Sequence, residues 1–412
     1  MTMQASLLIA ELMEWLHGPA SRIPDTLQLI EEFAKRLRAV GLKVDRMTTA
    51  IPLLHPNVRA ESVLWQDGQQ TEMRRFIGTP DLDEAYQNSP LKTVYTEERA
   101  VRFQVNSEPV QGEYGVSADL REAGMHDYVA LPMPFSDGSI KGITFATRDP
   151  VGFSDRDVLM FETAIKPLAL LLELHTLRRT AETVLETYVG KRAGKRVLEG
   201  SIRRGDGEEV SALVGFADIR GFTRLSNSLP GDQLLCLLNT YFDAMATSVE
   251  ACGGEVLKFI GDEVLTVFPF ETREEARKAA HCALSSSIRA MKKVLEINSC
   301  APETMPPLRC GIALHAGKLF FGNVGSETRL DFTVVGPTVN LANRLADVGK
   351  REGAPIVVSQ TVADLLGWQH PPIGTYELRG FEKAVPVYTV PEECVEELDG
   401  KTETVLSDLE KN

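Results

Sequence analysis

The chain has 412 residues, of which 43% are hydrophobic and 25% are charged, and its formal net charge is -14. This length accommodates two domains with connectors, and the composition is that of an ordinary globular protein. The acidic excess argues against nucleic acid or an anionic membrane surface as the main partner, because either requires a basic face.

The cysteines and the N-terminus bear on the compartment. Six cysteines are scattered without a C-x-x-C pair, which predicts reduced thiols rather than a disulfide framework or a zinc site. The N-terminus lacks the basic region of a signal peptide, and the apolar run 168–172 is far shorter than the roughly 20 residues of a membrane span. We therefore expect a cytoplasmic protein without a membrane span.

The first part of the chain has the pattern of a small α+β domain. Periodic apolar residues predict helices over 7–16 and 25–40, and strands follow over 43–54, 59–66 and 73–76. A polar, irregular stretch over 81–118 leads to a hairpin over 128–146 and to a closing helix capped by Ser154. This order resembles a GAF sensor domain. We assign residues 1–21 to an N-terminal helix and 22–174 to a GAF-like sensor or dimerisation domain, whose sensor ligand stays open.

Apolar residues continue along the closing helix with the spacing of a coiled-coil seam. The seam consists of Leu170, Leu174, Leu177, Ala181, Val184 and Tyr188. A single helix that packs this stripe on its own domain is one interpretation, and a parallel coiled coil between two protomers is the other, which we favour. Three glycines then predict a hinge-like connector, so that residues 175–204 form a coiled-coil and transducer linker.

Strands and helices alternate over residues 205–392. Strands are expected over 210–217, 255–260, 264–268, 308–315, 319–324 and 329–335, and helices over 231–252, 272–297 and 338–348. This order, with helices between early strands and hairpins elsewhere, predicts a ferredoxin-like α/β (α+β) sandwich. An acidic tail follows over 393–412.

Two aspartates stand at strand ends in this region. Asp218 ends an apolar strand and is followed by Gly221, Phe222 and Thr223, which places a carboxylate beside the exposed backbone N–H groups of a turn. Asp262 occupies a tight turn between two strands. Neighbouring strands that bring two carboxylates together can hold paired Mg²⁺ ions, as phosphoryl transfer requires. Each aspartate taken alone is explained better as an ordinary turn residue.

A later helix presents two polar side chains on one face. The helix begins at Gly336-Pro337, and Asn340 and Arg344 lie four residues apart along it. An amide and a guanidinium in this alignment can hold a ribose and a phosphate together. An exposed helix face that makes only local hydrogen bonds is the alternative.

The segments FADIRGFT, KFIGDE and FTVVGPTVNLANR, with GIALHAGKLFFGNVG between them, resemble the class III adenylate/guanylate cyclase catalytic domain in family order. The resemblance covers residues 205–392. It implies that Asp218 and Asp262 bind two metal ions, Mg²⁺ or Mn²⁺, with help from the Ile219 carbonyl. The implied activity is that of an adenylate cyclase, which converts ATP to cyclic AMP and pyrophosphate under control of the N-terminal domain.

The same resemblance implies the substrate contacts. Lys258 and Thr333 would read the adenine, Asn340 would orient the ribose, and Arg344 would stabilise charge on the α-phosphate. In the family these four residues come from one protomer and the metal aspartates from the other. A homodimer of this chain would therefore carry two composite active sites.

Two departures from the family pattern bear on specificity. Many members pair Lys with Asp at the base, whereas Thr333 holds the second position here, which is similar to the class IIIb subgroup, some of whose members respond to bicarbonate. The Glu/Cys pair typical of guanylate cyclases is absent, so ATP is favoured over GTP. Many relatives carry an Arg four residues before His315, where this chain has Gly311, and Arg309 and Lys383 are candidate phosphate contacts instead. A catalytically inactive signalling module and a GTP-using cyclase remain the alternatives.

Overall fold

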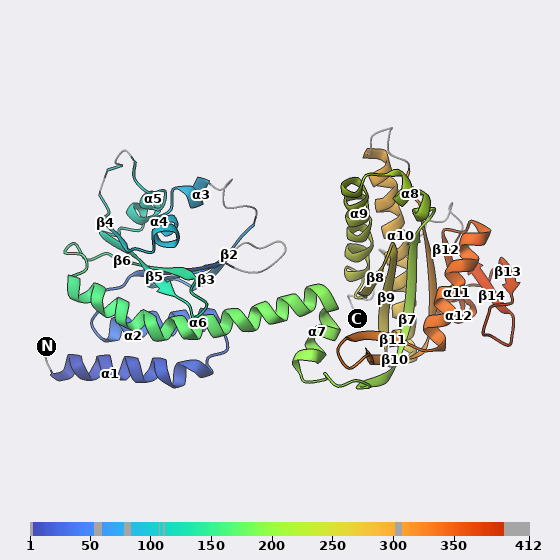
Figure 1. Cartoon of the computed structure of the whole chain (residues 1–412), viewed down its shortest axis with the longest axis horizontal. Coiled ribbons are helices and arrows are strands. Elements are labelled where there is room, and N and C mark those ends of the chain that lie inside the picture. Colours follow the sequence, from blue (N-terminus) through green and yellow to red (C-terminus); the bar gives the residue numbers. More distant parts are fainter. Residues whose placement is uncertain are drawn as a thin grey trace. The chain divides into compact units, whose positions relative to one another are not determined.

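The computed structural model describes residues 3–52, 60–77, 84–106, 108–109, 112–300 and 307–390. The chain divides into two compact units, Met1–Val184 and Leu185–Asn412, and each has its own β-sheet (Figure 1). Both units are mixed α+β, as the sequence predicts. Within the described residues, no helix is both long enough and apolar enough to cross a membrane. The predicted acidic tail lies outside the described residues.

The first unit is built on a six-stranded sheet in which every neighbouring pair is antiparallel, with the order β3-β2-β1-β6-β5-β4. The strands are β1 Arg46–Pro52, β2 Ala60–Gln66, β3 Glu72–Phe76, β4 Val101–Gln104, β5 Asp127–Pro134 and β6 Ile140–Thr147. The predicted hairpin over 128–146 is therefore confirmed as β5 and β6.

Helices cover both faces of this sheet (Figure 1). They are α1 Met3–His17, the short η1 Pro19–Arg22, α2 Thr26–Ala39, α3 Glu84–Gln87, α4 Pro90–Glu97, α5 Val116–Glu122 and the start of α6 Asp155–Val189. Alternate strand residues face opposite layers, so Phe145 packs against Phe161 of α6, while Tyr128 lies in a second cluster with Val94 of α4. The stretch predicted as irregular, 81–118, contains short elements whose periods are too brief to recognise in sequence.

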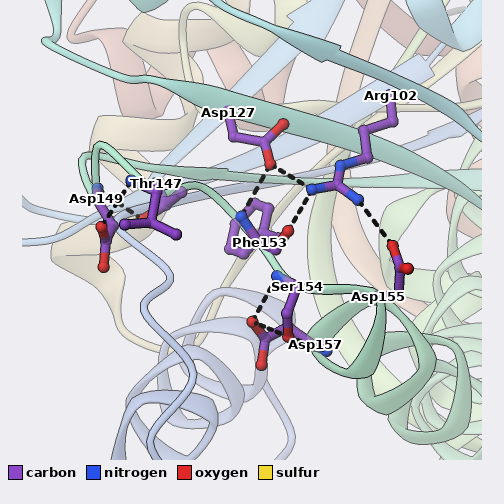
Figure 2. A network of polar contacts seen from close by, with 9 residues as sticks. Arg102, Asp127, Thr147, Asp149, Phe153, Ser154, Asp155 and Asp157 are labelled. Atoms are coloured by element: carbon purple, nitrogen blue, oxygen red, sulfur yellow. Dashed lines mark hydrogen bonds and ion pairs between the residues drawn. The ribbon is translucent and has the colours of Figure 1, made fainter.

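A buried carboxylate fixes the start of α6 on the sheet (Figure 2). The Asp127 side chain is 2% exposed and accepts hydrogen bonds from the Phe153 backbone N–H at 2.9 Å and from Arg102 Nη2 at 2.8 Å. Arg102 also pairs with Asp155, the first residue of α6, at 3.5 Å. Gly152 has a φ of +73°, and a Cβ there would lie 2.7 Å from Asp127 Oδ2. This glycine is therefore required both for its backbone conformation and for the space it leaves.

The predicted coiled-coil seam lies on α6 as an exposed apolar stripe. The beginning of the helix buries Phe161, Leu168 and Leu172 in the first unit. The seam side chains face solvent: Leu170 is 62% exposed, Leu174 55%, Leu177 60%, Val184 36% and Tyr188 83%. The interpretation in which the stripe packs on its own domain is therefore wrong for the residues described.

The second unit has an eight-stranded sheet with the order β13-β14-β12-β10-β7-β9-β8, and β11 pairs with β10. The strands are β7 Gly207–Ile219, β8 Glu255–Ile260, β9 Glu263–Phe270, β10 Cys310–Gly325, β11 Leu330–Val335, β12 Ile356–Ser359, β13 Gly374–Tyr376 and β14 Val385–Thr389. The antiparallel order β10-β7-β9-β8 places the fourth, first, third and second strands side by side. This is the ferredoxin-like arrangement that the sequence predicts.

The helices of the second unit are α7 Lys191–Leu198, α8 Phe222–Ser228, α9 Gly231–Glu250, α10 Arg273–Cys300, α11 Pro337–Glu352 and α12 Gln360–Leu366. Residues of α9 and α10 form one core with the sheet, and α11 packs against clusters on its other face. Part of the segment expected to be a hinge-like connector forms α7, which lies between Gly190 and Gly200, both at positive φ. Its Ala193 is fully buried in a cluster with Phe321 and Phe332, and burial of this face stabilises the helix.

The segment 308–325 also differs from prediction. Two strands are expected there, but β10 is continuous and pairs with β7 along its length, Gly317 facing Ala212. A Cβ on Gly317 would lie 2.6 Å from Thr338 Oγ1, so this glycine allows α11 to approach the strand. It does not mark a turn.

Candidate active site

The two predicted metal aspartates meet at the end of β7. Asp218 is the penultimate residue of that strand, and Asp262 lies in the turn between β8 and β9. The Ile219 backbone N–H donates to Asp262 Oδ2 at 3.1 Å, which joins the two segments directly. Ile219 and Asp262 are 43 positions apart in the sequence, and the pairing of β7 with β9 brings them together.

Negative charge is concentrated around this point. Burial raises the pKa of Asp218, and the nearby Asp262 carboxylate raises it further, whereas Arg220 and Lys350 lower it. Burial, followed by the charges of Asp218 and Asp262, raises the pKa of Glu263 to about 7. Asp218 Oδ1 is buried and has no hydrogen-bond partner among the described residues. Together these features favour a bound cation.

The donor set fits a hard divalent metal that is shared with a phosphate. No three carboxylate, imidazole or thiolate side chains in the described part of the chain converge as a complete metal site. Mg²⁺ is usually held by one or two carboxylates, with waters and substrate phosphates completing its shell. Asp218 and Asp262 would hold it here, and the Ile219 carbonyl lies on the same strand end.

Arg220, to which the sequence assigned no role, lies over Gly311 of the neighbouring strand β10. The Arg220 guanidinium contacts Asp218 Oδ1 at 3.4 Å and donates to the Ala354 carbonyl, after α11, at 3.3 Å. Gly311 pairs with Asp218 across the strands, and a Cβ on Gly311 would lie only 1.8 Å from Arg220 Nη2. The missing side chain at position 311 therefore leaves the space that Arg220 occupies.

The predicted phosphate contacts divide into two groups. Gly221 caps α8, and Phe222 and Thr223 open that helix immediately after β7. The exposed Arg309 lies at the same strand end, because its carbonyl accepts from the Arg220 N–H at 2.8 Å. Lys383 is exposed in the segment before β14, which β12 and β10 separate from β7. The structure thus gathers the first group beside Asp218, and nothing brings Lys383 there.

The predicted base-reading residues lie on β8 and β11. Lys258 forms an ion pair with Asp331, in which the Lys258 side chain is 27% exposed and the Asp331 side chain 55%. Thr333 is two residues further along β11 and is half-buried. Lys258 and Thr333 therefore belong to neighbouring segments of one protomer, and a carboxylate absent from the prediction accompanies them.

The polar residues of α11 form a separate surface. Asn340 is exposed, and Arg344 pairs with Asp347 at 3.3 Å. Across the described residues, no hydrogen bond or ion pair joins Lys258, Thr333, Asn340 or Arg344 to either metal aspartate. None of these four residues is therefore bonded to Asp218 or Asp262 within the described part of one protomer.

Three residues of this region were missed in the sequence: Arg220, Glu263 and Asp331. Each of them stands inside or beside a recognised motif, but the sequence does not show which side chain it contacts in the fold. Glu263 directly follows Asp262, which was the one local signal for a further acidic side chain.

These features place the second unit in the class of ferredoxin-like α+β domains with a paired-carboxylate site. A family model described as the adenylate and guanylate cyclase catalytic domain matches residues 206–392. The second unit therefore belongs to the adenylate and guanylate cyclase catalytic domain family, as the motifs predict.

Named proteins are similar to part of this chain. Adenylate cyclase 1 of Rhizobium meliloti is 29% identical over 249 residues, which are 56% of this chain and 36% of that protein. The adenylate cyclase of Anabaena cylindrica is 28% identical over 226 residues, 53% of this chain and 43% of that protein. The solved adenylyl cyclase CyaB from P. aeruginosa is 32% identical, with a TM-score of 0.41, over 45% of this chain and 96% of that one. The chain spans less than half the length of the two curated relatives.

Proposed function

We propose that this protein is an adenylate cyclase, which converts ATP to 3′,5′-cyclic AMP and pyrophosphate at composite sites in a homodimer. The observation that carries the proposal is the junction of Asp218 and Asp262 through the Ile219 N–H, at 3.1 Å, beside the buried Asp218 Oδ1, which accepts no hydrogen bond from the described residues and lies 3.4 Å from Arg220 Nη1. Curated relatives that bear the name adenylate cyclase support the substrate.

The chain's own residues have distinct parts in the proposed reaction. Asp218 and Asp262 would hold Mg²⁺ or Mn²⁺, which supplies activation of the ribose 3′-hydroxyl and neutralises the triphosphate. Lys258 donates to adenine N1, Asn340 orients the ribose, and Arg344 faces the α-phosphate, where charge builds in the transition state. Removing one such electrostatic group from a dry site costs on the order of 10²–10³ in rate.

Exposed apolar side chains support the homodimer. Phe259 and Ile260 follow Lys258 on β8, and both are exposed. Val335, which follows Thr333, and its strand partner Phe320 are exposed as well. Large apolar side chains that remain exposed on one unit can be covered in a protein interface. A second copy that covers them would bring its own aspartates to the Lys258 surface.

The first unit is proposed to regulate the cyclase unit. α6 starts on the buried Asp127 network, carries the exposed seam, and its last residue, Val189, packs against the cluster that contains Phe321 and Phe332. A GAF-like signal that changes the pairing of two α6 helices would therefore act on β10 and β11. Deletion of residues 1–170 should change the rate per dimer, and an unchanged rate at matched dimer concentration would disprove this part.

One assay tests the central claim. The purified full chain is incubated with ATP or GTP and with Mg²⁺ or Mn²⁺, and the product is identified by mass. We expect cyclic AMP, and Asp262→Ala should abolish it. The matched control is Asp243→Ala, at an exposed aspartate on α9, which should retain activity.

The outcomes separate the alternatives. Cyclic GMP as the main product would replace the substrate assignment by a guanylate cyclase. No cyclic product in any combination would favour an inactive signalling module. An active Asp262→Ala variant would mean that the carboxylates at the end of β7 are not the metal site.

A further inference from the structure

The ion pair between Lys258 and Asp331 joins two strands that are not neighbours in the sheet. β8 pairs with β9, whereas β11 pairs with β10, and 73 residues separate the two side chains. A surface ion pair contributes little stability by itself, so this contact does not explain the fold. The ion pair places the Asp331 carboxylate against the Lys258 ammonium, which is proposed to recognise the base.

Asp331 and Thr333 face the same side of β11. The intervening Phe332 and the following Val334 are 4% and 5% exposed, and they pack in the cluster behind the strand. Because side chains alternate along a strand, Asp331 and Thr333 point away from that cluster. The carboxylate, the hydroxyl and the Lys258 ammonium therefore share one surface.

The second oxygen of Asp331 is available. Its Oδ2 contacts Lys258, and neither Oδ1 nor the Thr333 hydroxyl makes a hydrogen bond to the described residues. Val335, on the same side of β11 as Asp331 and Thr333, and Val324 opposite Asp331 are exposed apolar side chains. This is a polar pair of fixed charge with one open acceptor and apolar walls, which suits the edge and faces of a flat base.

We propose that Asp331 is a specificity-determining residue that accepts a hydrogen bond from the adenine 6-amino group while Lys258 donates to adenine N1. Guanine presents a carbonyl at position 6, so the same carboxylate repels it, and its N1–H opposes the ammonium. This inference rests on the proposed function. It assigns to Asp331 the acceptor role that the resemblance gave to Thr333.

The test compares ATP with purine riboside 5′-triphosphate, which keeps N1 but lacks the 6-amino group. In the wild type, loss of this group should lower kcat/KM about 10- to 100-fold, the range for a hydrogen bond to a charged partner. Asp331→Ala should lower kcat/KM for ATP by a similar factor and should leave purine riboside triphosphate almost unaffected. The control Glu209→Ala breaks the exposed Lys318–Glu209 pair of 2.7 Å and should change neither value.

Three results would overturn the assignment. Equal losses for both substrates in Asp331→Ala would mean that Asp331 only orients Lys258. A greater loss of GTP use than of ATP use would mean that the carboxylate faces the guanine edge. An unchanged preference in Asp331→Ala, with loss of preference in Thr333→Val, would return the acceptor role to Thr333.

A binding measurement keeps this inference separate from the proposed function. Calorimetry with 3′-deoxy-ATP, which lacks the attacking hydroxyl, reports nucleotide affinity without turnover. Binding by the wild type that weakens about 10-fold or more in Asp331→Ala would support base reading by Asp331. Tight binding that the variant does not weaken would refute it and leave the proposed function intact. Failure of the wild type to bind would count against the proposed function itself.

Discussion

Gly311→Ala tests whether the Arg220 side chain needs the space that the absent side chain of Gly311 leaves. The added Cβ would lie 1.8 Å from Arg220 Nη2 and 2.2 Å from Cζ. Ordinary carbon contacts are about 3.5 Å or longer, so the guanidinium must move by roughly 1.5 Å. That shift breaks its 3.3 Å hydrogen bond to the Ala354 carbonyl and its 3.4 Å contact with Asp218.

The magnitude follows from these two contacts. Losing a hydrogen bond from a charged donor costs about 1.5–3 kcal/mol, and Gly→Ala at a compatible backbone position returns about 0.5–1 kcal/mol. The net loss of stability is then about 1–2 kcal/mol. Gly311 is not among the glycines with positive φ, so the backbone itself accepts alanine.

Urea unfolding of the full chain measures this loss, and a double-mutant cycle with Arg220→Met identifies its cause. In the Arg220→Met background, the clash is absent, so Gly311→Ala should be neutral or should stabilise by up to about 1 kcal/mol. A destabilisation of equal size in both backgrounds would refute the role of Arg220. Arg309→Met, at an exposed position of the same strand end, serves as the charge-matched control.

Three further predictions concern other parts of the chain. Gly152→Ala places a methyl group against Asp127 in a left-handed position and should destabilise the first unit by about 3 kcal/mol, as seen in thermal unfolding; a change below 1 kcal/mol would contradict the network of Figure 2. Burial lowers the pKa of His315 to about 4, so below pH 6.5 the imidazole is protonated in the unfolded chain but still neutral in the folded one. The free energy of unfolding should therefore drop by about 2 kcal/mol between pH 7 and pH 5, and His315→Gln should flatten this dependence on pH. Leu177→Glu should weaken dimerisation in sedimentation, whereas Arg178→Gln, off the seam, should not. Equal dimer dissociation constants for both variants and the wild type would rule out the α6 seam as part of the interface.

The sequence predicts the α+β frame well, because long amphipathic helices and apolar strands have strong local periods. It fails at Gly194, which was interpreted as a break but lies inside α7, and in the segment around Gly317, where two strands were expected and β10 is continuous. Gly194 would meet the Leu185 backbone at 3.0 Å if it carried a Cβ, and Gly317 would meet Thr338 at 2.6 Å. Both positions need glycine for close packing between elements, which a local pattern cannot distinguish from a turn.

The candidate site shows the same division. The position of Asp262 at a turn was visible in the sequence, and its bond to the Ile219 N–H confirms that the two motifs meet. Arg220 contacts Ala354, which is 134 positions away in the sequence, and Asp331 contacts Lys258, which is 73 positions away. Such partners follow from the sheet order, so a single sequence without the fold does not reveal them.

Arg220 has a consequence for communication within the proposed dimer. Its guanidinium contacts Asp218, which would serve one active site, and Ala354, which follows the helix α11 that would serve the other. Metal or nucleotide bound at the aspartates of one active site would thus act on α11, which would bind ribose and phosphate at the other active site, through the contacts of Arg220 with Asp218 and Ala354. Turnover should then depart from a hyperbolic dependence on ATP, with a Hill coefficient that returns to one when Gly311→Ala displaces the guanidinium.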